Sequence, residues 1–200
     1  MSRTAGAMYA DGTDFEANNY YFALGFAPSK KHDFQLTITG APQWHNQRKT
    51  SVALSDYLDP KYGGSEDKPN RKYNSDWGYM TGRDGVSRQY SFATNYYHKP
   101  IMSLNWDWNM AQKSKLSTVL YASFGRGGGS GDLGRVGGQY ASKFRTADGL
   151  YDFDAIRAAN LASNPTSGVI VKRASVNSHN WFGILSNFQQ KINDNWNFSL

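Results

Sequence analysis

The sequence predicts an all-β fold, namely a segment of an antiparallel, up-and-down transmembrane β-barrel with about six strands, long extracellular loops and one short loop helix. Two observations lead to this prediction. Stretches in which apolar and polar residues alternate occur in pairs, and a short polar turn joins each pair. Long polar connections join successive pairs, and aromatic residues reach 15% of the chain, which suits the aromatic girdles of membrane barrels.

The first strand pair spans residues 20–27 and 34–41, with a turn at 28–33. From residue 34 to residue 39, apolar side chains take the even positions and polar side chains take the odd positions. Because successive side chains of a strand point to opposite faces, this pair should form a hairpin with one apolar and one polar face.

The second pair spans residues 101–110 and 116–124, joined by residues 111–114. One face of its first strand is apolar along its whole length, with Met102, Leu104, Trp106, Trp108 and Met110. Residues 90–97 also alternate, which predicts that this strand continues past the membrane, with Pro100 as a local interruption. The two tryptophans could stack on a sugar, but a position on the lipid face explains them more simply.

The third pair begins with residues 181–192, followed by a turn at 193–195 and a sixth strand that the end of the chain cuts short. No apolar signal-peptide core follows Met1. We therefore expect residues 1–200 to be an internal piece of a longer chain.

Two long connections, at roughly residues 42–88 and 125–180, lie at one end of the strand pairs, and the three short turns lie at the other. Outer-membrane barrels have this asymmetry, with short periplasmic turns and long extracellular loops. Within the second connection, Asp152 and the helix-forming residues 153–162 predict a short capped helix, ended by Pro165 and Gly168.

Composition limits the other possibilities. The net charge is +6, but the basic residues are scattered, so no nucleic-acid partner is expected. Cysteine is absent, which excludes a disulfide framework and a thiolate zinc site. The mean hydropathy of -0.66 would suit a water-soluble protein, yet a membrane barrel exposes only every second strand residue to lipid. No stretch approaches the roughly 18 apolar residues of a spanning helix.

Sites for catalysis, metal or cofactor are not evident in the sequence. The glycine-rich residues 125–131 lack the Lys-Ser/Thr ending of a phosphate-binding loop, and a flexible loop explains them better. Asp11, Asp14 and Glu16 could share a calcium ion, but their spacing is not that of an EF-hand. No enzyme activity, metal or cofactor is predicted. The histidines, none of which lies three or four positions from another, are His32, His45, His98 and His179.

The connections mix aromatic residues with polar hydrogen-bonding residues, which suits capture of a polar or planar ligand. Packing within the loops explains the same mixture equally well, so both interpretations stay open. The candidate ligand contacts, all assigned to extracellular loops, are Trp44, His45, Arg48, Trp77, Tyr79, Arg83 and Arg126.

Four segments carry a resemblance to a known family. They are residues 90–100 (Tyr-Ser-Phe-Ala-Thr-Asn-Tyr-Tyr-His-Lys-Pro), residues 121–129 (Tyr-Ala-Ser-Phe-Gly-Arg-Gly-Gly-Gly), residues 151–156 (Tyr-Asp-Phe-Asp-Ala-Ile) with Asn160, and residues 177–183 (Asn-Ser-His-Asn-Trp-Phe-Gly). Together they resemble the TonB-dependent outer-membrane receptors of Bacteroidetes-type bacteria, over roughly residues 18–200. These are strand and loop sequences rather than catalytic signatures.

The resemblance implies a plugged barrel of about 22 strands. It also implies import of a scarce nutrient (a siderophore, a vitamin, a glycan or a peptide) across the cell outer membrane, with energy supplied through TonB. The implied partners are outer-membrane lipid, the TonB complex through the plug domain, a small nutrient ligand and, as a further candidate, a surface lipoprotein. The plug, the TonB box, the signal peptide and most strands are not found in this sequence, so it is expected to be a part of the barrel alone.

Two other classes remain as alternatives. A soluble, aromatic-rich β-sandwich that binds carbohydrate would pack its apolar strand faces against a second sheet. An envelope enzyme would need an acid–base pair that the sequence does not reveal.

Overall fold

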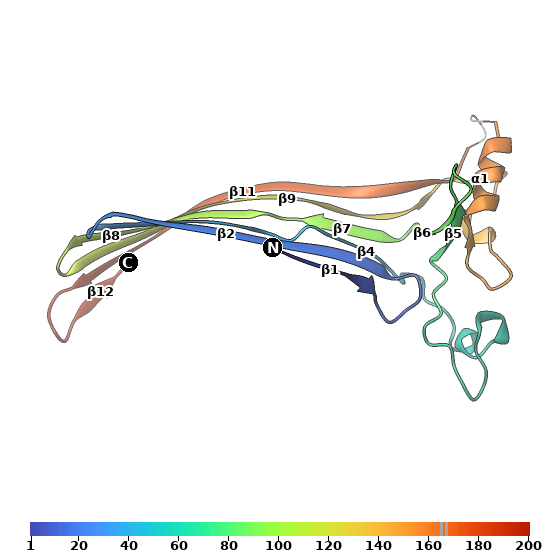
Figure 1. The fold of residues 1–200 in the computed structure, drawn as a ribbon, viewed down its shortest axis with the longest axis horizontal. Helices are drawn as coiled ribbons and strands as arrows, with labels where there is room; N and C mark the ends of the chain where they lie inside the picture. The colour runs from blue at the N-terminus through green and yellow to red at the C-terminus, as the bar shows by residue number, and fades with distance from the viewer. Residues whose placement is uncertain (165, 167) are drawn as a thin grey trace.

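The protein is mostly antiparallel β-sheet, as a computed structural model of residues 1–164, 166 and 168–200 describes it. A long curved sheet of nine strands runs the length of the molecule. A three-stranded sheet with one helix lies at one end (Figure 1). The long sheet contains β1 (Ser2–Ala7), β2 (Asp14–Ser29), β3 (His32–Gly40), β4 (Gln43–Asn46), β7 (Thr94–His98), β8 (Ile101–Ala111), β9 (Ser114–Leu133), β11 (Val171–Lys191) and β12 (Asn197–Ser199). The other elements are η1 (Leu54–Tyr57), η2 (Pro60–Tyr62), β5 (Trp77–Thr81), β6 (Ser87–Ser91), η3 (Ala141–Lys143), β10 (Tyr151–Asp152) and α1 (Phe153–Ala162).

Strands that follow one another along the chain are neighbours in the long sheet. β3 and β4 form one continuous strand, as do β7 and β8, because the register with the neighbouring strands is the same on both sides of each break. Pro42 and Pro100 cause the breaks, since proline has no N–H to donate. Their carbonyls still accept, from Asn18 N at 2.9 Å and from Phe124 N at 3.3 Å. The sheet therefore continues unshifted through both prolines.

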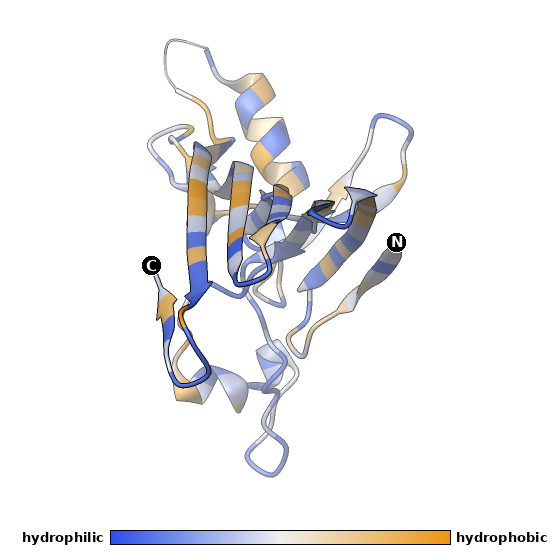
Figure 2. Cartoon of the chain, turned by 90° about the vertical axis from the view of Figure 1, so that its left-hand side faces the viewer, coloured by the Kyte–Doolittle hydropathy of each residue, from blue (hydrophilic) through white to orange (hydrophobic). Residues whose placement is uncertain are grey.

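One face of the sheet is apolar near the short turns. Across β2, β3, β8, β9 and β11, a single row in register consists of Leu24, Leu36, Leu104, Leu120 and Ile184. The adjacent row consists of Phe22, Ile38, Met102, Ala122 and Phe182. Along each strand, apolar residues of these rows alternate with more polar residues, which Figure 2 shows as orange and blue bands. Most of the large apolar side chains in these rows are exposed, for example 64% for Ile184 and 70% for Phe182, and those on β3 are partly exposed.

Aromatic rings border this apolar face. Next to the short turns, rings from β3 and β8 stack with centroids 5.7 to 6.4 Å apart. The rings are those of His32, Phe34, Trp106 and Trp108. At the other border, the Tyr20 hydroxyl lies 3.0 Å from His98 Nε2. On β3, eight residue steps separate Gly40, the register partner of Tyr20, from His32, the partner of Trp108. Eight steps cover roughly 27 Å along a strand, or about 20 Å along the membrane normal for a tilted strand. This is close to the ~25 Å apolar band of outer-membrane barrels.

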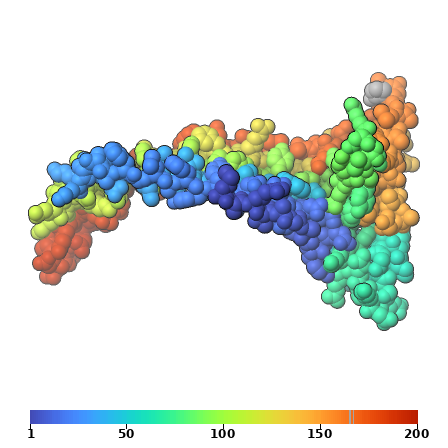
Figure 3. Space-filling view, in the orientation of Figure 1, coloured from blue at the N-terminus to red at the C-terminus, as the bar shows by residue number. Residues whose placement is uncertain are grey.

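The opposite face is mainly polar over the same stretch. Asn105 donates to Gln35 Oε1 at 3.3 Å across β8 and β3. Asp107 accepts from Ser117 Oγ at 2.6 Å and pairs with Lys115 at 3.0 Å across β8 and β9. The molecule is thin and curved along the long sheet, and it is widest at the end with the long loops (Figure 3).

The buried core lies at the loop end instead of within the long sheet. Its buried side chains are Phe92, Val136, Ala141, Tyr151, Phe153, Ile156 and Ile170. β10 pairs in parallel with β5, so the second long connection hydrogen-bonds to the first. Asp152 caps α1 by accepting from Ala155 N at 2.8 Å. Among the residues described, no helix has both the length and the apolarity required to cross a membrane.

The structure confirms the predicted strand pairs and the helix at 153–162 with its Asp152 cap. Gly168 follows the helix with a φ of 89°, and Pro165 lies outside the described residues. Three expectations were wrong in extent. β1, which pairs with β2, was not predicted. The second connection is shorter, because β9 and β11 extend into it, and the first is displaced along the chain, because β4 occupies its beginning and β7 starts only at Thr94. Tyr90 belongs to β6 and not to the strand that continues into β8.

Candidate ligand-binding site at the loop end

A cleft of about 340 Å³ opens among the loops at the wide end of the molecule. Its rings are Tyr62, Tyr73, Trp77 and Tyr79, and its charged side chains are Asp11, Lys61 and Asp148. We call it the loop-end cleft. Small-molecule sites have this range of volumes and combine aromatic walls with a few polar groups. The cleft is therefore the best candidate for a ligand site among the described residues.

The rings form two pairs. Tyr62 and Tyr73 stack with centroids 4.4 Å apart and an interplanar angle of 25°. Trp77 and Tyr79 share a face of β5, because they are two positions apart in a strand, and their rings meet edge to face at 5.3 Å. Tyr79 is 54% exposed, so part of this wall is open to solvent.

Each ring pair packs against a glycine that follows an aspartate. Gly12 lies against Trp77, where an added Cβ would come within 2.1 Å of the indole. Gly149 lies against the tyrosine pair, where a Cβ would come within 2.4 Å of Tyr62. Both glycines have positive φ, 71° and 81°, which L side chains rarely adopt. These turns hold Asp11 and Asp148 beside the rings.

Buried hydrogen bonds fix the segments that carry these residues. Asn74 is 1% exposed and donates from Nδ2 to the Asp11 carbonyl at 2.8 Å. Asp11 N donates to the Lys72 carbonyl at 2.9 Å. The Tyr73 hydroxyl donates to the Gly149 carbonyl at 3.3 Å. Three separate parts of the chain are thus tied together around the cleft.

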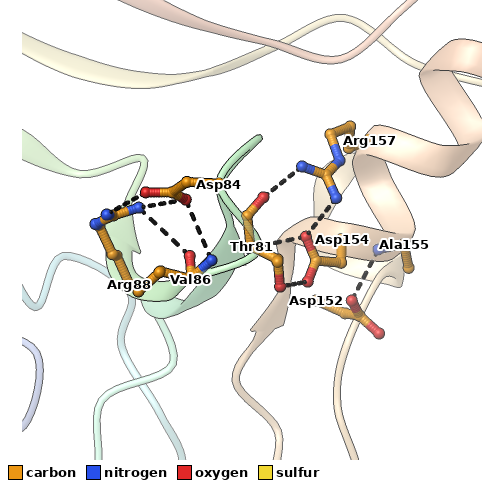
Figure 4. A network of polar contacts seen from close by, with 8 residues as sticks. All are labelled: Thr81, Asp84, Val86, Arg88, Asp152, Asp154, Ala155 and Arg157. Atoms are coloured by element: carbon orange, nitrogen blue, oxygen red, sulfur yellow. Dashed lines mark hydrogen bonds and ion pairs between the residues drawn. The ribbon is translucent and has the colours of Figure 1, made fainter.

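The helix α1 holds β5 in place from the other side (Figure 4). Asp154 accepts from Thr81 N at 3.0 Å and from Thr81 Oγ1 at 2.6 Å. Arg157 pairs with Asp154 at 3.2 Å and donates to the Thr81 carbonyl. The bonds from Thr81 lower the pKa of Asp154, and the positive charge of Arg157 adds a smaller effect. Since Trp77 and Tyr79 lie on β5, this contact positions one wall of the cleft.

Negative charge and burial determine the electrostatics of the cleft. Burial, together with the neighbouring Tyr62 and the carboxylates of Asp56 and Asp148, raises the pKa of Tyr73 to about 12, although Arg145 opposes the shift. Tyr73 therefore stays a neutral hydrogen-bond donor at physiological pH. Within the cleft, Lys61 Nζ lies 5.1 Å from the centre of the Tyr62 ring, so a cation already contacts one wall.

No family model, curated protein or solved structure matched the chain. The function therefore has to be argued from the residues and their arrangement.

Of the residues predicted to contact ligand, Trp77 and Tyr79 line the loop-end cleft. Arg48 lies in the first connection, where its Nη1 donates to the Arg71 carbonyl at 2.8 Å and so fastens the loop. Arg83 is exposed beside the turn at Asp84 and Gly85.

The assignment of the other three to loops was wrong, because they lie on strands of the long sheet. Trp44 and His45 are on β4, and Arg126 is on β9. Arg126 is paired with His98 and Ser178 in register, so it shares the face of Trp44 and not that of His45. The structure brings none of the three to the cleft.

Asp11 and Asp148 were not predicted as residues of a ligand site, and they line the cleft. Two Asp-Gly dipeptides marked the turns, but nothing in the sequence paired them with particular rings. The glycine-rich residues 125–131 proved to be strand β9. In the described part of the chain, no three acidic or histidine side chains cluster as metal ligands would.

Proposed function

We propose that this chain forms part of the wall of a TonB-dependent receptor in the cell outer membrane, which takes up a scarce nutrient. The even-numbered side chains of β2, β3, β8, β9 and β11 face lipid, and the odd-numbered ones face a wet interior. The short turns face the periplasm, and the loop-end cleft faces the exterior. The proposal includes further strands, which close the barrel, and a plug domain, which fills it.

The single observation that supports it most is the exposed apolar face. Two adjacent rows of apolar side chains cross five strands in register, bordered by aromatic rings on both sides. A water-soluble monomer rarely exposes such a patch, whereas a membrane barrel requires it. β9 and β11 have 20 and 21 residues, about twice the ~9–11 that a spanning strand needs, so their glycine-rich and polar halves would extend beyond the bilayer.

The β-sandwich alternative gains less support. It requires a second sheet packed on the apolar face, but the small sheet of β5, β6 and β10 lies at the end of the long sheet (Figure 1). The enzyme alternative requires an acid–base pair, and the described residues do not suggest one.

Adjacent single cysteines test the proposal, because the native chain has none. Leu104→Cys places a thiol on the apolar face, and Asn105→Cys places one on the polar face of the same strand. Each variant is labelled with an environment-sensitive fluorophore and refolded in micelles that contain a spin-labelled lipid. We expect blue-shifted emission and strong lipid quenching at position 104, and quenching by aqueous iodide at position 105.

Equal quenching at both positions would contradict the proposal. So would a monodisperse, cooperatively folding chain without detergent in which position 104 is protected, because that result indicates a soluble core. A third label at an exposed loop position, Ser65→Cys, provides the fully aqueous reference.

A further inference from the structure

We propose that the loop-end cleft binds a ligand through an organic cation, an ammonium or guanidinium group carried on an aliphatic stem. This inference names the ligand class of the receptor and rests on the proposed function for its biological meaning. The binding chemistry itself depends only on the cleft.

The rings provide the first part of the argument. Trp77, Tyr79, Tyr62 and Tyr73 line one cleft of about 340 Å³. The faces of tryptophan and tyrosine carry negative electrostatic potential, and organic cations bind them within about 6 Å of the ring centre. An aliphatic stem gains contact with the same rings, so a carried cation fits better than a small hydrated ion.

The carboxylates provide the second part. Asp11 and Asp148 both line the cleft, and each precedes a glycine that packs against a ring pair, Gly12 against Trp77 and Gly149 against the two tyrosines. The two acidic residues thus come from turns far apart in the sequence and line the same cleft. Neither has an ion-pair partner within 4 Å among the described residues. Asp148 Oδ1 accepts a hydrogen bond from Thr146 Oγ1, and the remaining acceptor positions of both exposed carboxylates are available to a ligand.

The cationic residues near the cleft are already engaged. Lys61 Nζ lies 5.1 Å from the Tyr62 ring centre, which shows that this wall accepts a cation. The Arg145 guanidinium lies 3.7 Å from the Tyr151 ring centre and donates to the Ser75 carbonyl. Arg48 donates to two backbone carbonyls. Lys61 alone carries positive charge among the lining residues, and it can be displaced because it is exposed.

The test uses the full chain refolded in neutral detergent micelles, with three probes: tetramethylammonium, methyl glucoside and citrate. Saturation-transfer NMR on the probe methyl and methylene protons detects weak binding. We expect transfer to tetramethylammonium, and little to methyl glucoside or citrate. The Asp11→Asn, Asp148→Asn double variant should bind the cation at least about fivefold more weakly.

Lys61→Met should strengthen binding, because it removes the internal cation and keeps the stem. A merely structural role for these residues would not produce opposite changes in the two variants. Asp84→Asn is the matched control, since Asp84 also lies in an Asp-Gly turn but pairs with Arg88 outside the cleft. It should leave binding unchanged.

Equal or stronger transfer to methyl glucoside or citrate, or no transfer to tetramethylammonium in Lys61→Met, would overturn the inference. Circular dichroism of each variant checks that the fold is retained. The cysteine labels at positions 104 and 105 report on the membrane proposal without any ligand, so failure of one proposal is separable from failure of the other.

Discussion

At the residue scale, glycines decide how closely the strands and their aromatic side chains approach. Tyr121 covers Gly183, its partner in register, and Tyr97 covers Gly127 in the same way. A ring laid over a glycine fills the space that a side chain would occupy and shields the backbone. Within residues 125–131, Tyr97 covers Gly127 and the His179 ring covers Gly125, which supports a strand where the sequence suggested a loop.

Gly128→Ala tests this explanation in β9. The added Cβ would come within 2.4 Å of the Ser175 carbonyl oxygen, a backbone atom that cannot move aside cheaply. We expect a loss of about 1–3 kcal/mol in the free energy of unfolding, measured by urea titration of the refolded chain. The neighbouring Gly129→Ala is the control, because its Cβ meets nothing nearer than 3.8 Å. Equal losses in both variants would show that steric approach is not the cause.

At the element scale, the two connections fold together as a unit with its own core. β10 adds to the edge of β5, and α1 docks on β5 through Asp154 and Arg157. Rings from both connections meet edge to face, with Phe92 5.3 Å from Tyr151 and 5.0 Å from Phe153. The loop end is therefore a rigid support for the cleft.

The docking of α1 should depend on pH. The pKa of Asp154 is lower in the folded chain than in the unfolded chain, where it is about 3.9. Its contribution to stability is thus complete above the unfolded value and is lost as the pH falls through the folded value. Because Asp154 is 43% exposed, we expect only about 1 kcal/mol. The protection of the β5 and α1 amides, taken relative to their intrinsic exchange rates at each pH, should fall below pH ~4 in the wild type.

Asp154→Asn is the corresponding variant. It should exchange faster than the wild type at neutral pH and should lack the acid-dependent step. A variant with the same acid-dependent step as the wild type would assign that step to another group, such as Asp84, whose pKa is also lowered, mainly by Arg88.

At the scale of the whole molecule, the sheet has two unlike faces and two unlike ends. One face carries leucine, isoleucine and phenylalanine across five strands, most of them exposed, and the other carries amides, hydroxyls and an ion pair together with the exposed Trp181 and Leu185 on β11. Short turns lie at one end, and the folded connections and the cleft lie at the other (Figure 3). The boundary that we propose between lipid and a wet interior accounts for both differences.

Arginine at adjacent positions tests this boundary energetically. Leu104 lies in the middle row of the apolar face, paired with Leu36 and Leu120. Leu104→Arg should therefore destabilise the refolded chain in lipid by about 2–4 kcal/mol. Asn105→Arg, on the polar face, should cost much less. Unfolding titrations in phospholipid provide the comparison, and a larger cost at position 105 would place the lipid on the other face.

The sequence by itself determined the local structure of this protein. Alternation with period two located the hairpins, polar residues located the turns, and Asp152 with the residues after it located α1, because each of these depends on neighbours in the chain. Only the tertiary structure decided that Asp11, Trp77 and Asp148 line one cleft. Their arrangement depends on close packing of rings against glycines from distant turns, and no local pattern encodes which ring packs against which glycine. The same holds for β1 and β4, whose pairing was fixed by neighbouring strands and not by their own short sequences.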